Sequence, residues 1–310
     1  MSLSGIRFRT RSSSFSLALG YPLFHIGLSL DLFSSYPNHI MQTVLGPFHP
    51  YLETALVDEI LQYKCDDPFR PLLILLPSDS LRRHLKIVLS RQRRLSLLNV
   101  HLLTFFQLSS RLYAEGSSDA PKLRDDLFIE EVVRRLIRAR QAGAEAFAGI
   151  EERLGGCAAL WQTLRDLRDA GVDPQLGLEG LCEGQFGRGT HEHTAHILVL
   201  LQTLLRSCEL KAIRTQAELD QRATAQVPSS SYLRQFGQVF YYGFYDLTQI
   251  QIDLFHAVAQ NYPATLFFPL LPGRPSHQGW RFAERFYERH VQGFSSPTRD
   301  LTAVGTPVLP

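Results

Sequence analysis

The chain has 310 residues, enough for two domains of ordinary size or one large domain. Hydrophobic residues make up 45% of the chain and charged residues 20%, a globular composition that excludes a largely disordered protein. The net charge is only +2, so affinity for nucleic acid has to come from local basic patches and not from the charge of the whole chain.

Cysteine usage and hydropathy indicate the setting of the protein. The four cysteines are far apart and form no CxxC pair, which is typical of free thiols in a reducing compartment and not of a disulfide framework or a zinc site. No stretch reaches the ~18 consecutive apolar residues expected of a membrane span. We therefore expect a cytoplasmic protein with no membrane partner. The cysteines are Cys65, Cys157, Cys182 and Cys208.

The first forty residues differ in composition from the rest of the chain. They contain an Arg-rich stretch at residues 6–11 and many Ser, Phe and Leu residues, and Asp31 is their only acidic residue. Transit and signal peptides share such features. The alternative, which we favour, is that translation starts at Met41 and that residues 1–40 are a disordered or mis-called extension.

Residues 41–118 alternate between short apolar runs and segments with helical spacing. Such alternation of strand and helix is typical of an α/β domain with a parallel sheet. The run between Pro71 and Pro77 reads as a buried strand of that sheet. The predicted strands cover residues 43–45, 71–77 and 97–103, and the helices after them cover residues 52–63, 81–92 and 105–113.

From residue 119 to residue 228 the apolar residues recur at helical spacing, which predicts an all-helical block. Strand character returns in residues 229–272, so we expect the helical block to be inserted into the α/β domain. Residues 273–310 begin a following region, and its lack of a structural close favours a truncated product. The later predicted elements are helices at 154–170, 190–210, 215–225, 248–261 and 281–290, and strands at 238–242 and 264–269.

The segment after the first predicted strand stands where a nucleotide-binding loop would stand. In the pattern G-x-x-x-x-G-K-[ST], backbone N–H groups surround the phosphates and the Lys contacts their oxygens. Here Gly46 matches the first Gly, but Tyr51, Leu52 and Glu53 replace the second Gly, the Lys and the Mg²⁺-binding hydroxyl residue, with Thr54 following. Two prolines also remove N–H donors. The sequence therefore predicts a degenerate loop that binds neither ATP nor Mg²⁺.

Four segments in this order carry a resemblance to a known family. They are L-I-L-L-P at residues 73–77 with the helix that follows, V-H-L-L-T-F-F-Q-L at 100–108, L-R-D-L-R-D-A-G-V-D-P at 164–174, and F-Y-Y-G-F-Y-D-L-T-Q-I-Q at 240–251. With them, residues 41 to about 290 resemble the N-terminal helicase-like part of the AddB subunit of AddAB-type helicase–nucleases (PD-(D/E)XK nuclease family proteins). The resemblance extends more distantly to RecC-type and other superfamily-one helicase modules.

The resemblance implies a parallel-sheet, P-loop-like domain of the superfamily-one helicase type with an inserted helical subdomain. It implies a role in DNA double-strand-break repair, with DNA, most often single-stranded, and an AddA-like motor–nuclease subunit as partners. An iron–sulfur cluster would belong to the family's C-terminal nuclease domain, far beyond residue 310.

The chain departs from the family at the residues that an active motor needs. A motor carries an Asp-Glu pair at the end of the strand that leads into Gly243, to hold Mg²⁺ and orient water. Tyr242 stands where the family often has Asp, and Asp246 alone does not replace the pair. We therefore expect a non-motor region without catalytic residues, although the full-length relative would be a nuclease.

A basic stretch after the strand at 71–77 is the first candidate DNA site. Guanidinium and ammonium groups there would contact phosphates in a salt-dependent way. The alternative is a solvated helix face. The residues are Arg82, Arg83, Lys86, Arg91, Arg93 and Arg94.

Two further polar groups follow predicted strands. Thr104, Phe105 and Gln107 begin a helix whose N–H groups would bind phosphate and whose aromatic ring would stack on a base. The alternative is an N-cap with core aromatics. A second crevice is predicted at Tyr245, Asp246, Thr248 and Gln249, since ligands of open α/β sheets bind at strand carboxyl ends. Its alternative is turn chemistry with Thr248 as an N-cap.

No metal site is predicted. His191-Glu192-His193 and His196 fail the HExxH pattern, because that pattern places its two His residues four positions apart. Two other functions stay open from the sequence. The chain would be an α/β interaction module without a DNA role, or the truncated N-terminus of an active ATP-dependent deoxyribonuclease.

Overall fold

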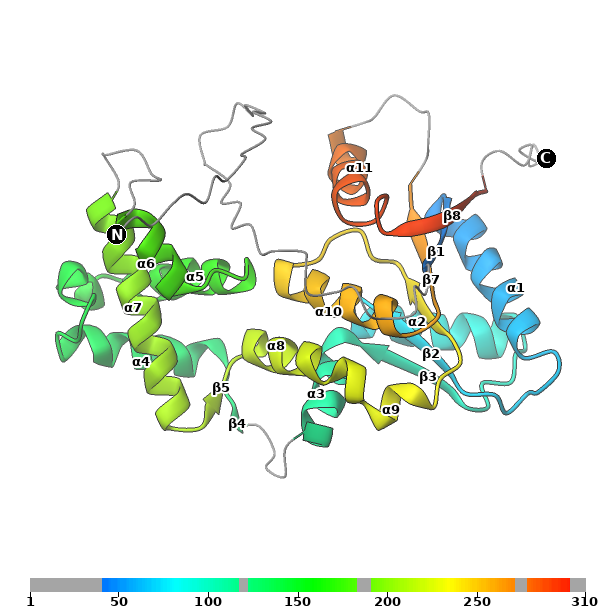
Figure 1. Cartoon of the computed structure of the whole chain (residues 1–310), viewed down its shortest axis with the longest axis horizontal. Helices are drawn as coiled ribbons and strands as arrows, with labels where there is room; N and C mark the ends of the chain where they lie inside the picture. Colours follow the sequence, from blue (N-terminus) through cyan, green and yellow to red (C-terminus); the bar gives the residue numbers. More distant parts are fainter. Residues whose placement is uncertain (1–40, 117–121, 183–190, 271–277, 302–310) are drawn as a thin grey trace, which may run out of the picture. The chain divides into compact units, whose positions relative to one another are not determined.

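The computed structural model describes residues 41–116, 122–182, 191–270 and 278–301 (Figure 1). The predictions about residues 1–40 and about the chain end at 302–310 lie outside these residues. The described residues all belong to one compact unit, Pro37–Pro310.

A six-stranded sheet forms the centre of the α/β part, in the order β3-β2-β6-β7-β1-β8. Every pair of neighbouring strands in it is parallel, which confirms the predicted α/β class. The edge strand β8 was not predicted, because its residues contain no apolar run. The strands are β1 (Met41–Gly46), β2 (Leu72–Leu76), β3 (Val100–Thr104), β6 (Val239–Tyr242), β7 (Ala264–Pro269) and β8 (Ser295–Asp300).

Alternation along the central strands supplies a core on each face of the sheet. Leu72, Ile74 and Leu76 of β2 face one cluster, and Leu73 and Leu75 face the other, all of them fully buried. Burying each such side chain stabilises the fold by about 1.5–3 kcal/mol. Helices α1 (Glu53–Tyr63) and α2 (Asp79–Ile87) cover the first face; α3 (Phe105–Gly116), α10 (Gln249–Asn261) and α11 (Gln278–His290) cover the second.

Between α3 and β6 the chain forms further helices around a third cluster of buried residues. A two-stranded parallel sheet also lies here, which corrects the expectation of purely helical structure. Helix α8 packs in the sheet cluster through Ala223, next to α3 and α10. The elements are β4 (Lys122–Leu123), α4 (Asp126–Arg138), η4 (Glu145–Phe147), η5 (Ile150–Glu152), α5 (Gly156–Asp169), α6 (Pro174–Cys182), α7 (His191–Leu210), β5 (Ile213–Arg214), α8 (Gln216–Gln226), η6 (Val227–Ser229) and α9 (Ser231–Arg234).

The connections leave the sheet toward opposite faces at neighbouring strands. The chain continues from β2 into α2 on one face and from the adjacent β6 toward α10 on the other. The same divergence occurs between β1 and β7. Crevices form where such connections separate at the carboxyl ends of parallel strands, so this edge positions the candidate site.

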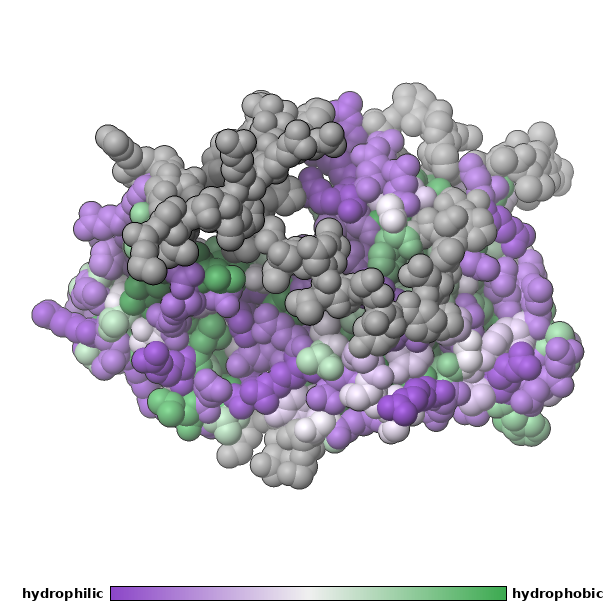
Figure 2. All heavy atoms as spheres, in the orientation of Figure 1, coloured by the Kyte–Doolittle hydropathy of each residue, from purple (hydrophilic) through white to green (hydrophobic). Residues whose placement is uncertain are grey.

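The visible surface is mainly hydrophilic, and hydrophobic residues appear in separate patches among hydrophilic ones (Figure 2). Among the described residues no helix is both long and apolar enough to cross a membrane.

Candidate functional site

The loop between β1 and α1 is folded around its own side chains. It begins at Gly46 and forms the short helical turn η2 (Phe48–Leu52) before α1 starts at Glu53. Leu52, in the position of the P-loop Lys, is fully buried in the cluster beneath α1. Its side chain therefore contributes to the core and offers nothing to a phosphate.

Glu53 is a buried carboxylate that lies close to two basic side chains. It is 5% exposed, and its oxygens lie 3.4 Å from Nδ1 of His49 and 3.7 Å from Nη2 of Arg93. The same Arg93 nitrogen donates a hydrogen bond of 3.2 Å to Oγ1 of Thr54. The residues of this loop do not fit a Mg²⁺–nucleotide, because a carboxylate stands near the expected phosphates and the Thr54 hydroxyl accepts from an arginine.

Phe48 packs across the end of β6. Its ring centroid is 5.2 Å from that of Tyr242, and a Cβ atom added to Gly243 would lie 3.3 Å from Phe48 and 2.6 Å from Leu81. Gly243 also has a φ of +82°, which side chains rarely adopt. Burial raises the pKa of Tyr242, and the nearby Glu53 raises it further, so the phenol stays neutral.

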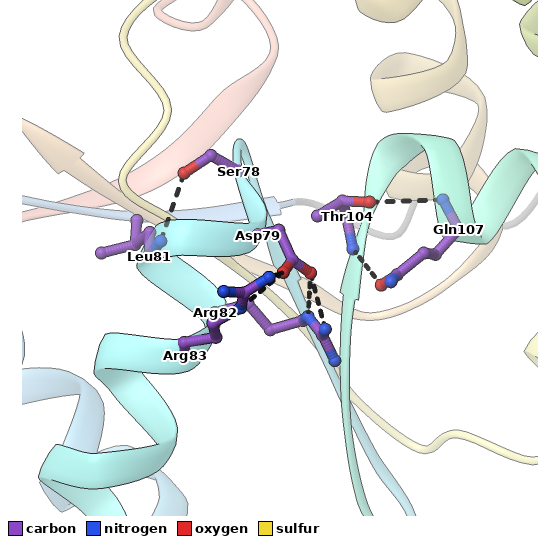
Figure 3. A network of polar contacts seen from close by, with 7 residues as sticks. All are labelled: Ser78, Asp79, Leu81, Arg82, Arg83, Thr104 and Gln107. Atoms are coloured by element: carbon purple, nitrogen blue, oxygen red, sulfur yellow. Dashed lines mark hydrogen bonds and ion pairs between the residues drawn. The ribbon is translucent and has the colours of Figure 1, made fainter.

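The predicted basic stretch divides into paired and unpaired side chains. Arg82 and Arg83 both bind Asp79, with ion-pair distances of 2.6 and 2.8 Å (Figure 3). Hydrogen bonds from Arg82 and then Arg83 lower the pKa of Asp79. Arg93 is held by Glu53 and Thr54, as described above. The remaining members, Lys86, Arg91 and Arg94, are exposed, and their side chains make no hydrogen bond or ion pair with the described residues.

The second predicted group forms a helix cap. The N–H of Thr104 donates to Oε1 of Gln107 at 3.1 Å, and the N–H of Gln107 donates to Oγ1 of Thr104 at 3.3 Å (Figure 3). Phe105 is 4% exposed and packs on Phe244, as the alternative of a core aromatic expects, so its ring is not open to a base in this structure. The exposed ring is that of Phe106, which is 47% exposed.

The third predicted group, the second crevice, contains a helix cap and exposed side chains. Thr248 forms a capping box with Gln251 at the start of α10, and Gln249 donates to Asp253 on the same helix. Tyr245, Asp246 and Gln249 are exposed, and Thr248 is partly buried. The alternative of an N-cap therefore describes Thr248, whereas Tyr245 and Asp246 line a hollow.

The structure brings Asp246 into two adjoining hollows at the carboxyl edge. They share Pro77, Ser78 and Asp246 and have cavity volumes of about 760 and 430 Å³. The first is also lined by Phe48, Leu81, Gly243, Tyr245, Pro269 and Ala283, and the second by Asp79, Thr104, Phe105, Phe106, Gln216, Phe244, Leu247 and Gln251. We call the two together the carboxyl-edge crevice.

Another hollow, of about 470 Å³, lies among α4, α5, α8 and the start of α10, and it shares Gln216 and Gln251 with the smaller hollow of the crevice. Its Asp126 accepts hydrogen bonds from Trp161 and Arg165 at 3.1 and 2.6 Å. Burial lowers the pKa of Arg168 and raises that of Asp220, which is 2% exposed. This hollow was not predicted, although Arg165 and Arg168 lie in the family-like segment at residues 164–174. Their spacing on one helix face was the available signal.

His191, His193 and His196 lie in the first turns of α7, where the ring of His193 packs against Phe147 with centroids 5.6 Å apart. No group of three or more metal-ligating side chains occurs within the described ranges.

Comparison with protein-family models gives no match. A search of curated proteins gives none either. A functional assignment therefore depends on the residues and geometry described above.

Proposed function

We propose that this chain contains the non-motor, DNA-binding and scaffold region of an AddB-like helicase–nuclease subunit acting in DNA double-strand-break repair in the cytoplasm. The α/β part would be a P-loop-like, superfamily-one helicase domain, with residues 119–228 as its inserted helical subdomain. Support comes from the four family-like segments and from the parallel sheet that β1, β2, β3, β6 and β7 share.

The observation that carries the proposal is the loop between β1 and α1. Buried Leu52 replaces the lysine, and buried Glu53 is held by the loop's own His49 and by Arg93. A nucleotide phosphate would have to displace these contacts and approach a carboxylate in a place of low dielectric, which costs several kcal/mol. ATP hydrolysis is therefore not the function of this loop.

The same ion pair connects the loop to the proposed DNA surface. Arg93 ends the segment formed by α2 and the turn η3 (Val88–Gln92), so this segment is fixed beside the start of α1. Its unpaired cations, Lys86, Arg91 and Arg94, are exposed. Cations in such positions release counterions when they bind phosphates, which supports binding of a DNA strand here. A motor–nuclease subunit of the AddA type would supply the strand.

Salt-dependent DNA binding tests the proposal. We expect a labelled oligothymidylate to bind the wild-type chain, with an affinity that falls as salt rises. Lys86→Ala/Arg91→Ala/Arg94→Ala should reduce the slope of log K against log salt by about 2, because each single-strand phosphate contact contributes about 0.7.

A matched variant removes the same charge elsewhere. Arg135→Ala/Arg138→Ala/Arg140→Ala acts on exposed cations at the end of α4 and just beyond it, and should leave the slope unchanged. Equal effects of the two triple variants, or no DNA binding at all, would contradict the DNA-binding part of the proposal.

A second function, an interaction module without a DNA role, is favoured by one apolar surface. Lys64 donates hydrogen bonds to the carbonyls of Pro68, Arg70 and Leu98, and Asn99 donates to the carbonyl of Phe69. These bonds hold residues 68–70 and 98–99 next to each other near the end of α1, and the side chains of Phe69 and Leu98 in these segments are exposed. An absence of DNA binding would make this the better account.

A further inference from the structure

The carboxyl-edge crevice has exposed aromatic rings around its opening. Phe48, Tyr245 and Phe106 are 37%, 57% and 47% exposed. Phe48 lies between β1 and α1, Tyr245 lies between β6 and α10, and Phe106 lies in the first turn of α3. Leu81, Pro269 and Ala283 add apolar walls to the larger hollow. Its cavity volume of about 760 Å³ is within the range of sites that hold a small ligand or a large side chain.

The crevice holds one carboxylate that has no cationic partner among the described residues. Its acidic lining residues, as far as the structure describes the lining, are Asp79 and Asp246. Asp79 is neutralised by Arg82 and Arg83. Asp246 belongs to both hollows, is exposed, and has no hydrogen-bond or ion-pair partner among the described residues.

The aromatic rings and the unpaired carboxylate together favour a ligand with a positive charge. A DNA strand in the crevice would bring phosphates toward the unpaired carboxylate of Asp246, which is unfavourable. A cation gains an ion pair with Asp246 and is also attracted to the faces of aromatic rings. A Lys or Arg side chain additionally places its aliphatic stem on apolar walls of the kind that Leu81 and Pro269 provide.

We propose that the carboxyl-edge crevice binds a lysine or arginine side chain of an extended segment of a partner protein, with the cation on Asp246 and beside the rings of Phe48 and Tyr245. This interaction does not depend on the proposed DNA site, because Lys86, Arg91 and Arg94 do not line the crevice. The two sites therefore succeed or fail separately.

The probe is a peptide array with degenerate flanks, in which the central residue is arginine, citrulline or glutamate. Citrulline keeps the shape of arginine without its charge. The full chain should bind the arginine pool about tenfold more strongly than the citrulline pool, and the glutamate pool least. The Asp246→Asn variant should bind the arginine and citrulline pools alike, whereas Asp58→Asn, an exposed carboxylate outside the crevice, should keep the preference.

Tyr245→Ala tests the aromatic contribution, because this exposed ring can be removed without opening the core. It should weaken binding of the arginine pool and leave the thermal unfolding temperature unchanged. Equal binding of the arginine and citrulline pools by the wild-type chain would overturn the proposal. It would also be overturned if an oligothymidylate displaced the bound peptides and lost affinity through Tyr245→Ala, since the crevice would then be a nucleic-acid site.

Discussion

Two neighbouring places at the carboxyl edge of the same sheet differ in what fills them. After β1, buried Leu52 and the Glu53–Arg93 pair occupy the loop. After β2 and β6, the chain leaves an open crevice in which Asp246 has no partner among the described residues. Topology provides both places, and the side chains decide which of them accepts a ligand.

The largest expected loss of stability distinguishes Phe105 from its neighbour Phe106 at the crevice. Phe105→Ala should reduce the free energy of unfolding by about 3–5 kcal/mol, because it empties a buried site packed on Phe244. Phe106→Ala, at an exposed ring, should change it by less than about 0.5 kcal/mol. Denaturant unfolding of both variants checks the assignment, and similar losses would contradict the placement of the two rings.

Gly243 lies at the contact between the loop and the crevice. Gly243→Ala should cost about 2 kcal/mol, since its Cβ would meet Leu81 at 2.6 Å and Phe48 at 3.3 Å at a positive φ. Gly149→Ala is the matched control, because Gly149 also has a positive φ but no atom within 4 Å of an added Cβ. Its cost should be about 1 kcal/mol, the backbone strain alone. If denaturant unfolding gives equal costs, Phe48 and Leu81 do not pack on Gly243 as described.

The ion pair between Glu53 and Arg93 should contribute measurably to stability. Arg93→Ala leaves the buried Glu53 without its arginine, so we expect a loss of about 1–2 kcal/mol in the free energy of unfolding. Arg91→Ala removes an exposed cation with no partner in the described ranges and should cost less than about 0.5 kcal/mol. A double-mutant cycle with Glu53→Gln isolates the pair, and a coupling energy near zero would show that Arg93 does not hold the loop.

The buried carboxylate of Asp220 should make the free energy of unfolding depend on pH. Burial raises the pKa of Asp220 above 3.8 in the folded chain, so ionising it disfavours folding, and the penalty grows as the pH rises through the folded pKa. Asp220→Asn should therefore stabilise the chain at pH 7 and lose this advantage toward pH 4. Urea unfolding of the wild-type chain and of this variant at the two pH values measures the difference. A pH-independent effect of Asp220→Asn would contradict the role of burial.

Much of the sheet was predictable because its strands are uninterrupted apolar runs. The continuous apolar run at residues 72–76 is typical of a central strand that is buried on both faces, and each of these residues is fully buried. Strand β8 was not predicted because Ser295–Asp300 contains no apolar run. It is a strand because its backbone pairs with β1. The short pair β4–β5 joins residues about ninety positions apart, which no local pattern indicates.

The candidate site was predictable in place but not in detail. Strand ends located Thr104, Tyr245 and Asp246, yet only the helix orientation decides that Phe105 is buried and Phe106 exposed. The pairing of Arg93 with Glu53 joins residues forty positions apart, so sequence reasoning placed Arg93 on a free DNA-binding surface. Whether a cation can bind DNA depends on whether another side chain already pairs with it, and the residue type alone does not show this.

The central claim is that the chain's own side chains fill the place where a motor binds nucleotide. The most direct measurement is titration calorimetry of the full chain with Mg²⁺–ATP, together with an assay of ATP hydrolysis. The account predicts no saturable binding and no hydrolysis. Saturable binding or hydrolysis that is lost when Leu52 or Glu53 is altered would contradict it.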